Sequence, residues 1–116
     1  MLKRVNRLKK RYQFSYVYKA GSHFSEKALV LYVTTSKTRD IKVGFAVTKK
    51  IGKAVVRNLT KRRLREIVAK QLPKVKQNYN IILVAKDNIS NFSFAELEKQ
   101  FINLLRQAEL FNEKSV

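Results

Sequence analysis

Side chains that could carry out acid–base, nucleophilic or metal chemistry are few in this sequence. His23 is the only histidine and there is no cysteine, so neither a thiolate metal site nor a disulfide framework can form. The acidic residues are scattered without metal-ligand spacing, and Glu96 and Glu98 point apart on an expected helix. We therefore predict no catalytic residue and no metal held by the protein alone, and we interpret His23 as a loop residue.

Positive charge is the chemistry that the sequence does offer. The 116 residues include 26 Lys and Arg against 8 Asp and Glu, a formal net charge of +18. Like charges repel in a compact domain, so this excess favours a polyanionic partner, usually nucleic acid. An anionic membrane, or a basic surface without a partner, is the weaker alternative. No membrane-length apolar run and no signal-peptide pattern is present, so we expect a cytoplasmic protein.

Two stretches hold most of the basic residues. Residues 1–20 contain seven Lys or Arg and no acid, and residues 48–70 contain nine against Glu66 alone. On a helix, one side of the second stretch forms what we call the basic ridge: Arg57, Asn58, Lys61, Arg62 and Arg65. The side expected to pack inward holds Leu59, Leu64 and Ile67. Too few acids are available for the ridge to be a salt-bridged helix face, so it indicates contact with a polyanion.

Apolar periodicity predicts a single α+β domain over residues 1–116, with frayed segments at 1–10 and 112–116. We expect three helices and a small four-stranded sheet in the order α-β-β-β-α-β-α. The expected helices are 11–19, 58–71 and 93–110, and the expected strands are 28–35, 42–48 and 79–85, with a short strand near 22–25.

The strand patterns indicate where each strand lies. Residues 79–85 are apolar on both faces, which is typical of a central, buried strand. One face of strand 42–48 carries only the small residues Gly44 and Ala46, so we expect a bulky group close to that face. The polar segment 36–40 is interpreted as a hairpin loop between the two strands that flank it.

The helix ends carry recognisable signals. We expect Gly21 to end the first helix in a left-handed conformation. Ser93 and Glu96 form an S-x-x-E capping box at the start of the longest expected helix. That helix has an apolar stripe for packing on the sheet: Leu97, Phe101, Leu104, Leu105 and Ala108.

Three segments, in order, resemble one known family. The motif in 48–66 is carried by Lys49, Lys50, Gly52, Ala54, Val55, Arg57, Asn58, Lys61, Arg62, Arg65 and Glu66. It is similar to the signature of the bacterial ribonuclease P protein subunit, and residues 6–21 and the Leu-Val-Leu-Tyr strand at 29–32 resemble the same family. The resemblance covers essentially the whole chain. It departs at Leu59, where the signature usually has Arg, so either one RNA contact is missing or Arg63 covers part of it.

The resemblance implies the protein subunit of ribonuclease P, a ribonucleoprotein endonuclease that removes the 5′ leader of precursor tRNA. The catalytic RNA subunit, with its Mg²⁺, would do the cutting, and the protein would bind that RNA and precursor tRNA as a non-catalytic component. The implied RNA-binding residues are Lys49, Lys50, Lys53, Arg57, Asn58, Lys61, Arg62 and Arg65. Asn58 would also be an outer-sphere contact to Mg²⁺.

The family fold implies a cleft between the first helix and the sheet in which the single-stranded leader lies. The rings expected to stack on its bases are Phe14, Tyr18, Tyr32 and Phe111. Core packing explains Phe14 equally well, whereas the hydroxyls of the two tyrosines favour the cleft. Tyr12 and Tyr16 lie on the other side of the helix and are expected to have a different role.

Two other interpretations share the charge and the rings. One is a different RNA-binding module, such as a ribosomal or RNA-chaperone protein. The other is a DNA-binding protein that inserts helix 58–71 into a major groove, although a strand rather than a partner helix is expected before it. A membrane-surface role is weaker, because the apolar faces are needed for the core.

Overall fold

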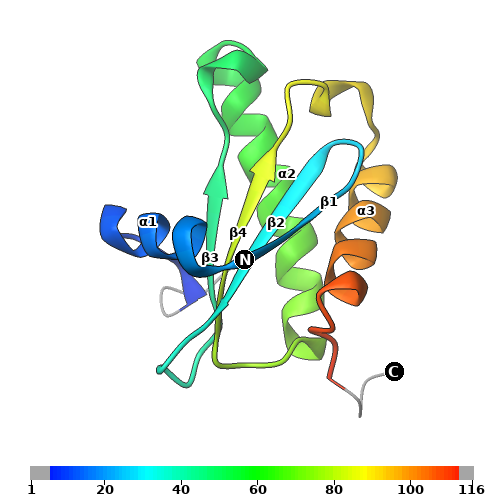
Figure 1. Cartoon of the computed structure of the whole chain (residues 1–116). Helices are drawn as coiled ribbons and strands as arrows, with labels where there is room; N and C mark the ends of the chain where they lie inside the picture. The colour runs from blue at the N-terminus through cyan, green and yellow to red at the C-terminus, as the bar shows by residue number, and fades with distance from the viewer. Residues whose placement is uncertain (1–5, 113–116) are drawn as a thin grey trace.

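The structure is a computed structural model and describes residues 6–112 (Figure 1). The helices are α1 (Arg11–Ala20), α2 (Ala54–Gln71) and α3 (Phe94–Gln107). The strands are β1 (Ser22–Ser25), β2 (Leu29–Thr35), β3 (Lys42–Ala46) and β4 (Tyr79–Ala85). Short 3₁₀ turns are η2 (Lys49–Ile51), η3 (Leu72–Lys74) and η4 (Ile89–Asn91). The α+β class, the element order and the short first strand are confirmed.

The segments next to the two ends are packed. Residues 1–5 and 113–116, part of the expected frayed ends, lie outside the described residues. Within the segment expected to fray, Leu8 is instead buried and its N–H donates to the Val43 carbonyl at 2.9 Å. The Asn112 N–H likewise donates to the Lys74 carbonyl at 2.8 Å. Leu8 and Asn112 are therefore held by backbone hydrogen bonds to β3 and η3, and the expectation of frayed ends stays a prediction.

The sheet has the strand order β1-β2-β4-β3, so β4 is central as expected. β4 pairs antiparallel with β2 and parallel with β3. Residues 36–40 therefore do not form a hairpin loop, and that interpretation was wrong: β4 lies between the two strands that the segment connects. The Ser36 N–H donates to the Asn78 carbonyl at 2.7 Å, which holds the connection against the entrance to β4. An apolar strand takes the centre because both of its edges can be paired there.

The two faces of the sheet have different covers. In Figure 1, α2 passes behind the sheet, α3 runs beside β1 and β2 on the right, and α1 lies on the left in front of β3. Residues of α2 and α3 share the main core. Alternate residues of each strand point to opposite faces of the sheet. Leu31 and Leu83 belong to the main core, whereas Ile82 packs with Leu8 and Val17 in a smaller core under α1. The main core is nearly sealed, and the α1 face is only partly covered.

Two helix boundaries differ from expectation. α2 begins at Ala54, four residues earlier than expected, and at 18 residues it is the longest helix among the described residues. Its first turn has no core-facing apolar residue, so the apolar pattern of the sequence does not show where it begins. α3 has 14 residues and ends at Gln107, since Glu109 adopts a left-handed φ of 56°.

The capping box at the start of α3 is confirmed: the Glu96 N–H donates to Ser93 Oγ at 3.2 Å, and the Ser93 N–H donates to Glu96 Oε1 at 2.9 Å. The backbone hydrogen bond from Ser93 is the main cause of the lowered pKa of Glu96.

Gly21 ends α1 for a reason other than the one expected. Its φ of −84° and ψ of 159° are extended rather than left-handed, so the predicted cap was wrong. The Gly21 N–H still donates to the Val17 carbonyl at 2.9 Å. A Cβ at this position would lie 2.6 Å from both the Val17 and the Val33 carbonyl oxygens, so glycine is required by close approach of backbone.

We expect Gly21→Ala to lower the free energy of unfolding by about 1–3 kcal/mol, because two backbone segments must move to admit the methyl group. Urea titration measures the loss. Ser22→Ala, on the neighbouring exposed residue, is the matched control and should change stability by no more than about 0.5 kcal/mol. Equal stability of the two variants would contradict the close approach.

Candidate nucleic-acid interface

Two tyrosine rings meet on the α1 face of the sheet. Tyr18 of α1 and Tyr32 of β2 have ring centroids 4.8 Å apart at an interplanar angle of 81°. Burial, and then the neighbouring Tyr32, raise the pKa of Tyr18. The structure therefore brings together the two rings that the sequence placed in the cleft.

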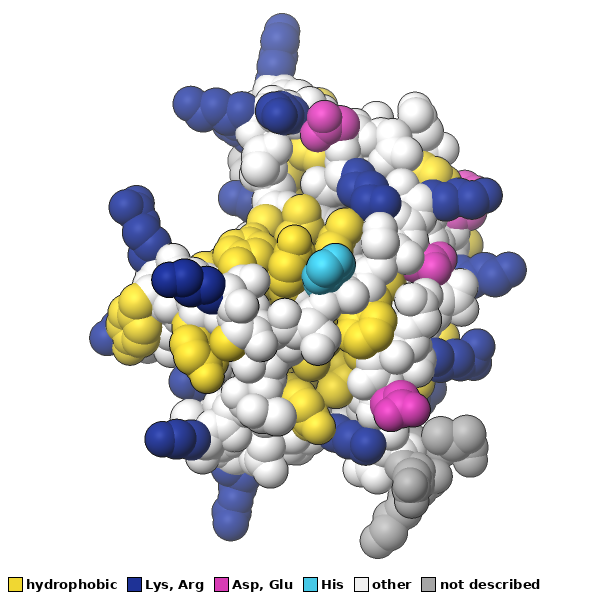
Figure 2. Space-filling model, in the orientation of Figure 1, with side chains coloured by type: hydrophobic (Ala, Val, Ile, Leu, Met, Phe, Trp, Pro, Cys, Tyr) yellow, Lys and Arg dark blue, Asp and Glu magenta, His cyan; other side chains and the backbone are white. Residues whose placement is uncertain are grey.

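His23 adds a third ring that sequence reasoning missed. It lies on β1 rather than in a loop, so that interpretation was wrong, and it is the register partner of Tyr32. The two rings are 5.5 Å apart and tilted by 31°. Figure 2 shows the imidazole beside an apolar patch on this face of the molecule. Only the pairing of the short first strand with β2 could have revealed this position.

The other two expected rings have different surroundings. Phe14 packs on Gly44, since a Cβ there would lie 2.5 Å from Phe14 Cζ, which confirms the bulky group expected at the small residue. Phe14 is half-buried and joins the small core under α1. Phe111 instead packs against the main core on the opposite face and bridges to Val75. It does not lie at an end of the cleft, because the segment after α3 returns beside η3.

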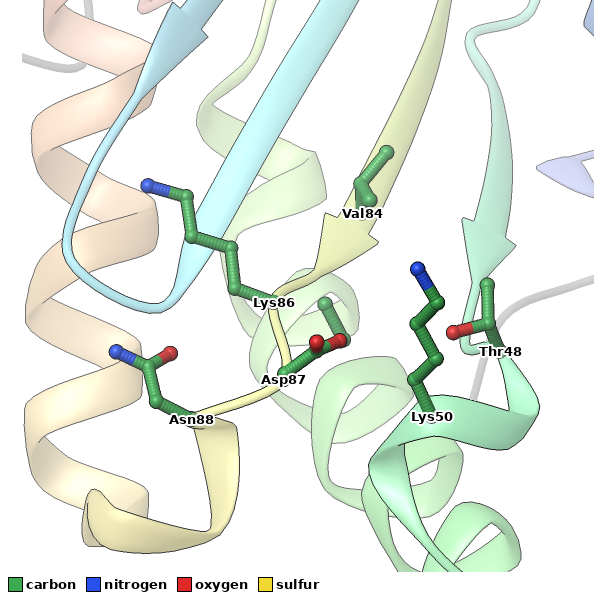
Figure 3. Close-up of a pocket in the computed structure, with 7 residues that line it drawn as sticks. Thr48, Lys50, Val84, Lys86, Asp87 and Asn88 are labelled. Carbon is green, nitrogen blue, oxygen red and sulfur yellow. The ribbon is translucent and has the colours of Figure 1, made fainter.

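A hollow of about 570 Å³ opens where β3 and β4 end (Figure 3). Thr48 and Lys50 line it from the segment after β3, and Lys86 lines it from the end of β4. The Lys86 ammonium donates to Ser25 Oγ at 2.9 Å and to the Glu26 carbonyl, so its charge is tied to the turn between β1 and β2. Lys50 is exposed and therefore offers its charge to a ligand in the hollow.

The basic ridge runs along α2 and reaches α1. Four of the five ridge side chains line a groove of about 470 Å³ with Glu66: Asn58, Lys61, Arg62 and Arg65. Lys61 and Arg65 also line a pocket of about 190 Å³ that includes Phe14. Among residues 6–112, no ridge side chain has an ion pair. The ridge and the α1 region thus form one surface.

The start of α2 concentrates positive charge that has no ion pair among residues 6–112. Lys49 and Lys50 lie on η2, and Lys53 is the N-cap residue, without a side-chain capping bond. The first turn of α2 has no acidic residue, although the helix dipole favours negative charge there. Arg57 follows and is half-buried. An anion at this end would therefore relieve both charge repulsion and the unfavourable dipole interaction.

Leu59 does not pack inward, and that expectation was wrong. It is 43% exposed, whereas Leu64 and Ile67 are fully buried as expected. Leu59 lies about 140° from Leu64 around the helix axis, so the two cannot share one face. Thr60 takes the inward position and its hydroxyl donates to the Val56 carbonyl at 2.9 Å. The structure thus leaves an uncharged side chain on a surface of cations.

Comparison with known proteins shows the family to which this chain belongs. The sequence profile of the family Ribonuclease P matches residues 2–109. The chain belongs to the ribonuclease P protein family. The ribonuclease P protein component of Alkaliphilus oremlandii (strain OhILAs) is 38% identical over 111 residues, covering 96% of this chain and 97% of that protein. Membership makes this chain a protein component of ribonuclease P, which acts in tRNA processing, and implies RNA partners in a ribonucleoprotein.

Solved ribonuclease P proteins share the fold. Staphylococcus aureus RNase P protein superposes with a TM-score of 0.85 at 28% identity, covering 92% of this chain and 98% of that one. A mutant of the S. aureus protein with defective mRNA degradation activity gives a TM-score of 0.86 at 27% identity, covering 92% and 91%. The expected relation to this family is therefore confirmed in sequence and in structure.

Two further properties concern the described part of the chain. Within residues 6–112, no three His, Cys, Asp or Glu side chains converge on a position where they could hold a metal ion. No helix in this range is long and apolar enough to cross a membrane.

Proposed function

We propose that this protein binds two RNAs, the catalytic RNA subunit of ribonuclease P and the 5′ leader of precursor tRNA, while the RNA subunit performs the cleavage. The observation that carries the proposal is the position of the Tyr18–Tyr32 ring pair on the open α1 face. The basic ridge supports it, because α2 connects to the same region through the Phe14 pocket. Rings and cations side by side are the two components of single-stranded RNA binding.

The leader lies on the α1 face. Tyr18, Tyr32 and His23 offer adjacent rings, and bases stack on such rings with little sequence preference. The hollow beside Lys50 continues this surface, since Val84 both lines it and packs on the small core under α1. Tolerance of sequence suits a leader whose bases differ between precursor tRNAs.

The basic ridge, together with the three lysines before α2, binds the catalytic RNA. Among residues 6–112 its side chains have no ion pair, so they can neutralise RNA phosphates. The counterions that this releases from the RNA make the affinity fall steeply with salt. A major-groove DNA complex is less consistent with the fold, because β3 and η2 rather than a partner helix precede α2.

Mg²⁺ in this proposal belongs to the RNA, where it activates water and stabilises the charge on the phosphate that is cut. The protein supplies cations that hold the two RNAs together when Mg²⁺ is scarce. Asn58 lines the ridge groove with Glu66, and its amide oxygen is available to a hydrated ion on the RNA. The protein component is thus non-catalytic, and its contribution is binding and placement.

We expect Tyr18→Ala and Tyr32→Ala to weaken binding of leader-containing precursor tRNA to the reconstituted complex by about 5- to 100-fold, the worth of one stacked base. Binding of tRNA without a leader should be unchanged. Fluorescence titration with the two tRNAs measures the difference. Tyr32→Phe keeps the ring and is the control. Equal losses with both tRNAs would contradict placement of the leader here and favour a general RNA-binding module.

We expect Leu59→Arg to strengthen binding of the catalytic RNA at low salt. The plot of log affinity against log salt should steepen by about 0.7–0.9, the contribution of one added phosphate contact. Filter binding over a range of KCl concentrations measures the slope. Ala95→Arg adds the same charge to the exposed side of α3, outside the ridge, and should leave the slope nearly unchanged. An identical response of the two variants would count against ridge contact.

A further inference from the structure

The outer face of α1 presents two rings that the proposed function does not use. Tyr12 and Tyr16 are 67% and 59% exposed, and they lie one helical turn apart. Val17 is fully buried against the sheet, and Tyr12 and Tyr16 lie about 140° and about 100° from it around the helix axis, so both rings are on the solvent side of α1. Neither ring packs in a core, and their exposure therefore has no structural explanation within the chain.

The surroundings of these rings are strongly basic. Residues 6–25 contain no acidic side chain. The Lys10 ammonium lies 5.9 Å from the centre of the Tyr12 ring, within the range of a cation–π contact. Arg11 and Lys19 are exposed on the same ten-residue helix. Figure 2 shows hydrophobic side chains projecting from the α1 end of the molecule between Lys and Arg side chains.

The chemistry of this face identifies the kind of partner. A second copy of the chain would bring like charges together, which disfavours self-association through this face. Cations beside exposed, rigid rings suit a ligand that carries both negative charge and flat apolar surfaces. Unpaired nucleotides have both, since their phosphates bind the cations and their bases stack on the rings.

We propose that Tyr12 and Tyr16 form a second stacking surface, which binds an unpaired segment of the catalytic RNA subunit. The inference rests on the proposed function and extends it to a face of α1 that the leader does not reach. α1 is a ten-residue helix, about 10–12 Å across with its side chains, that separates the outer rings from Tyr18. A leader on the sheet side would have to reverse around the helix to reach the outer face.

The two rings differ from the basic ridge in the physical origin of the affinity they add. Stacking releases few counterions, so its contribution depends weakly on salt, whereas that of the ridge depends strongly. The protein therefore holds the catalytic RNA at two places, by charge along α2 and by stacking on α1. Helix α1 lies between the two RNAs, with one RNA on each side.

The test compares Tyr12→Ala/Tyr16→Ala with Tyr12→Phe/Tyr16→Phe in binding to the catalytic RNA without precursor tRNA. We expect the alanine variant to bind about 5- to 100-fold more weakly, with an unchanged salt slope, and the phenylalanine variant to bind as the wild type. Alanine favours helix at these exposed positions, so α1 should persist, which circular dichroism checks. Leader-dependent affinity of precursor tRNA for the assembled complex should not change.

Arg62→Ala in the same assay separates this inference from the proposed function. If Arg62→Ala weakens binding and the alanine pair does not, the second surface is overturned and the ridge stands. If neither variant changes binding, the proposed function fails as well. A loss confined to precursor tRNA would assign the outer rings to the leader, and a loss only of self-association would assign them to a second copy; either result overturns the inference.

Discussion

The central position of β4 is the constraint on which the rest of the structure depends. Both edges of β4 are paired, and Ile81, Ile82 and Leu83 are fully buried on its two faces. Because neighbouring residues of one strand face opposite ways, this single segment anchors both the main core under α2 and α3 and the small core under α1. The division leaves one face of the sheet open enough to bind a ligand.

Electrostatic repulsion between the many cations is a second constraint on the fold. A net charge of +18 on 116 residues opposes compaction, and the uncharged main core must offset it. The cations on the outer side of α2, on η2 and around α1 lie outside both cores. An RNA partner reverses the sign of this term, so binding and stability are coupled: phosphates on the ridge should stabilise the fold as well as complete the complex.

Much of the fold follows from local patterns in the sequence. The doubly apolar run at β4, the capping box at Ser93 and the small residue at Gly44 each allowed one dominant explanation, and each was confirmed. The predictions were wrong where contacts between segments distant in the sequence determine the local structure. The order of strands, not the polarity of residues 36–40, rules out a hairpin, and the closeness of Val33 to Gly21 cannot be inferred from residues near Gly21 in the sequence.

The site was predictable to the extent that it follows helix periodicity. Lys61 and Arg65 line one groove, as helix spacing indicated. The cleft position of Tyr18 and Tyr32 was implied by the family resemblance, and the structure places their ring centroids 4.8 Å apart. His23 was missed because only strand register brings it to Tyr32, and Phe111 was misplaced because the chain after α3 turns back toward η3. Leu59 was wrongly expected to pack inward because residues spread over half of the helix circumference were assigned to one buried face. In the structure Leu59 lies at the border between the buried and exposed sides.

The central claim is that a protein without cleavage chemistry assists an RNA that has it. Leader removal should therefore be measured with the purified protein, the catalytic RNA of the same organism and precursor tRNA, at low and high Mg²⁺. We expect the protein alone not to cleave precursor tRNA, and the combination to restore at low Mg²⁺ the cleavage that the RNA alone achieves only at high Mg²⁺. Cleavage by the protein alone, or no gain in rate or affinity on adding it, would contradict the claim.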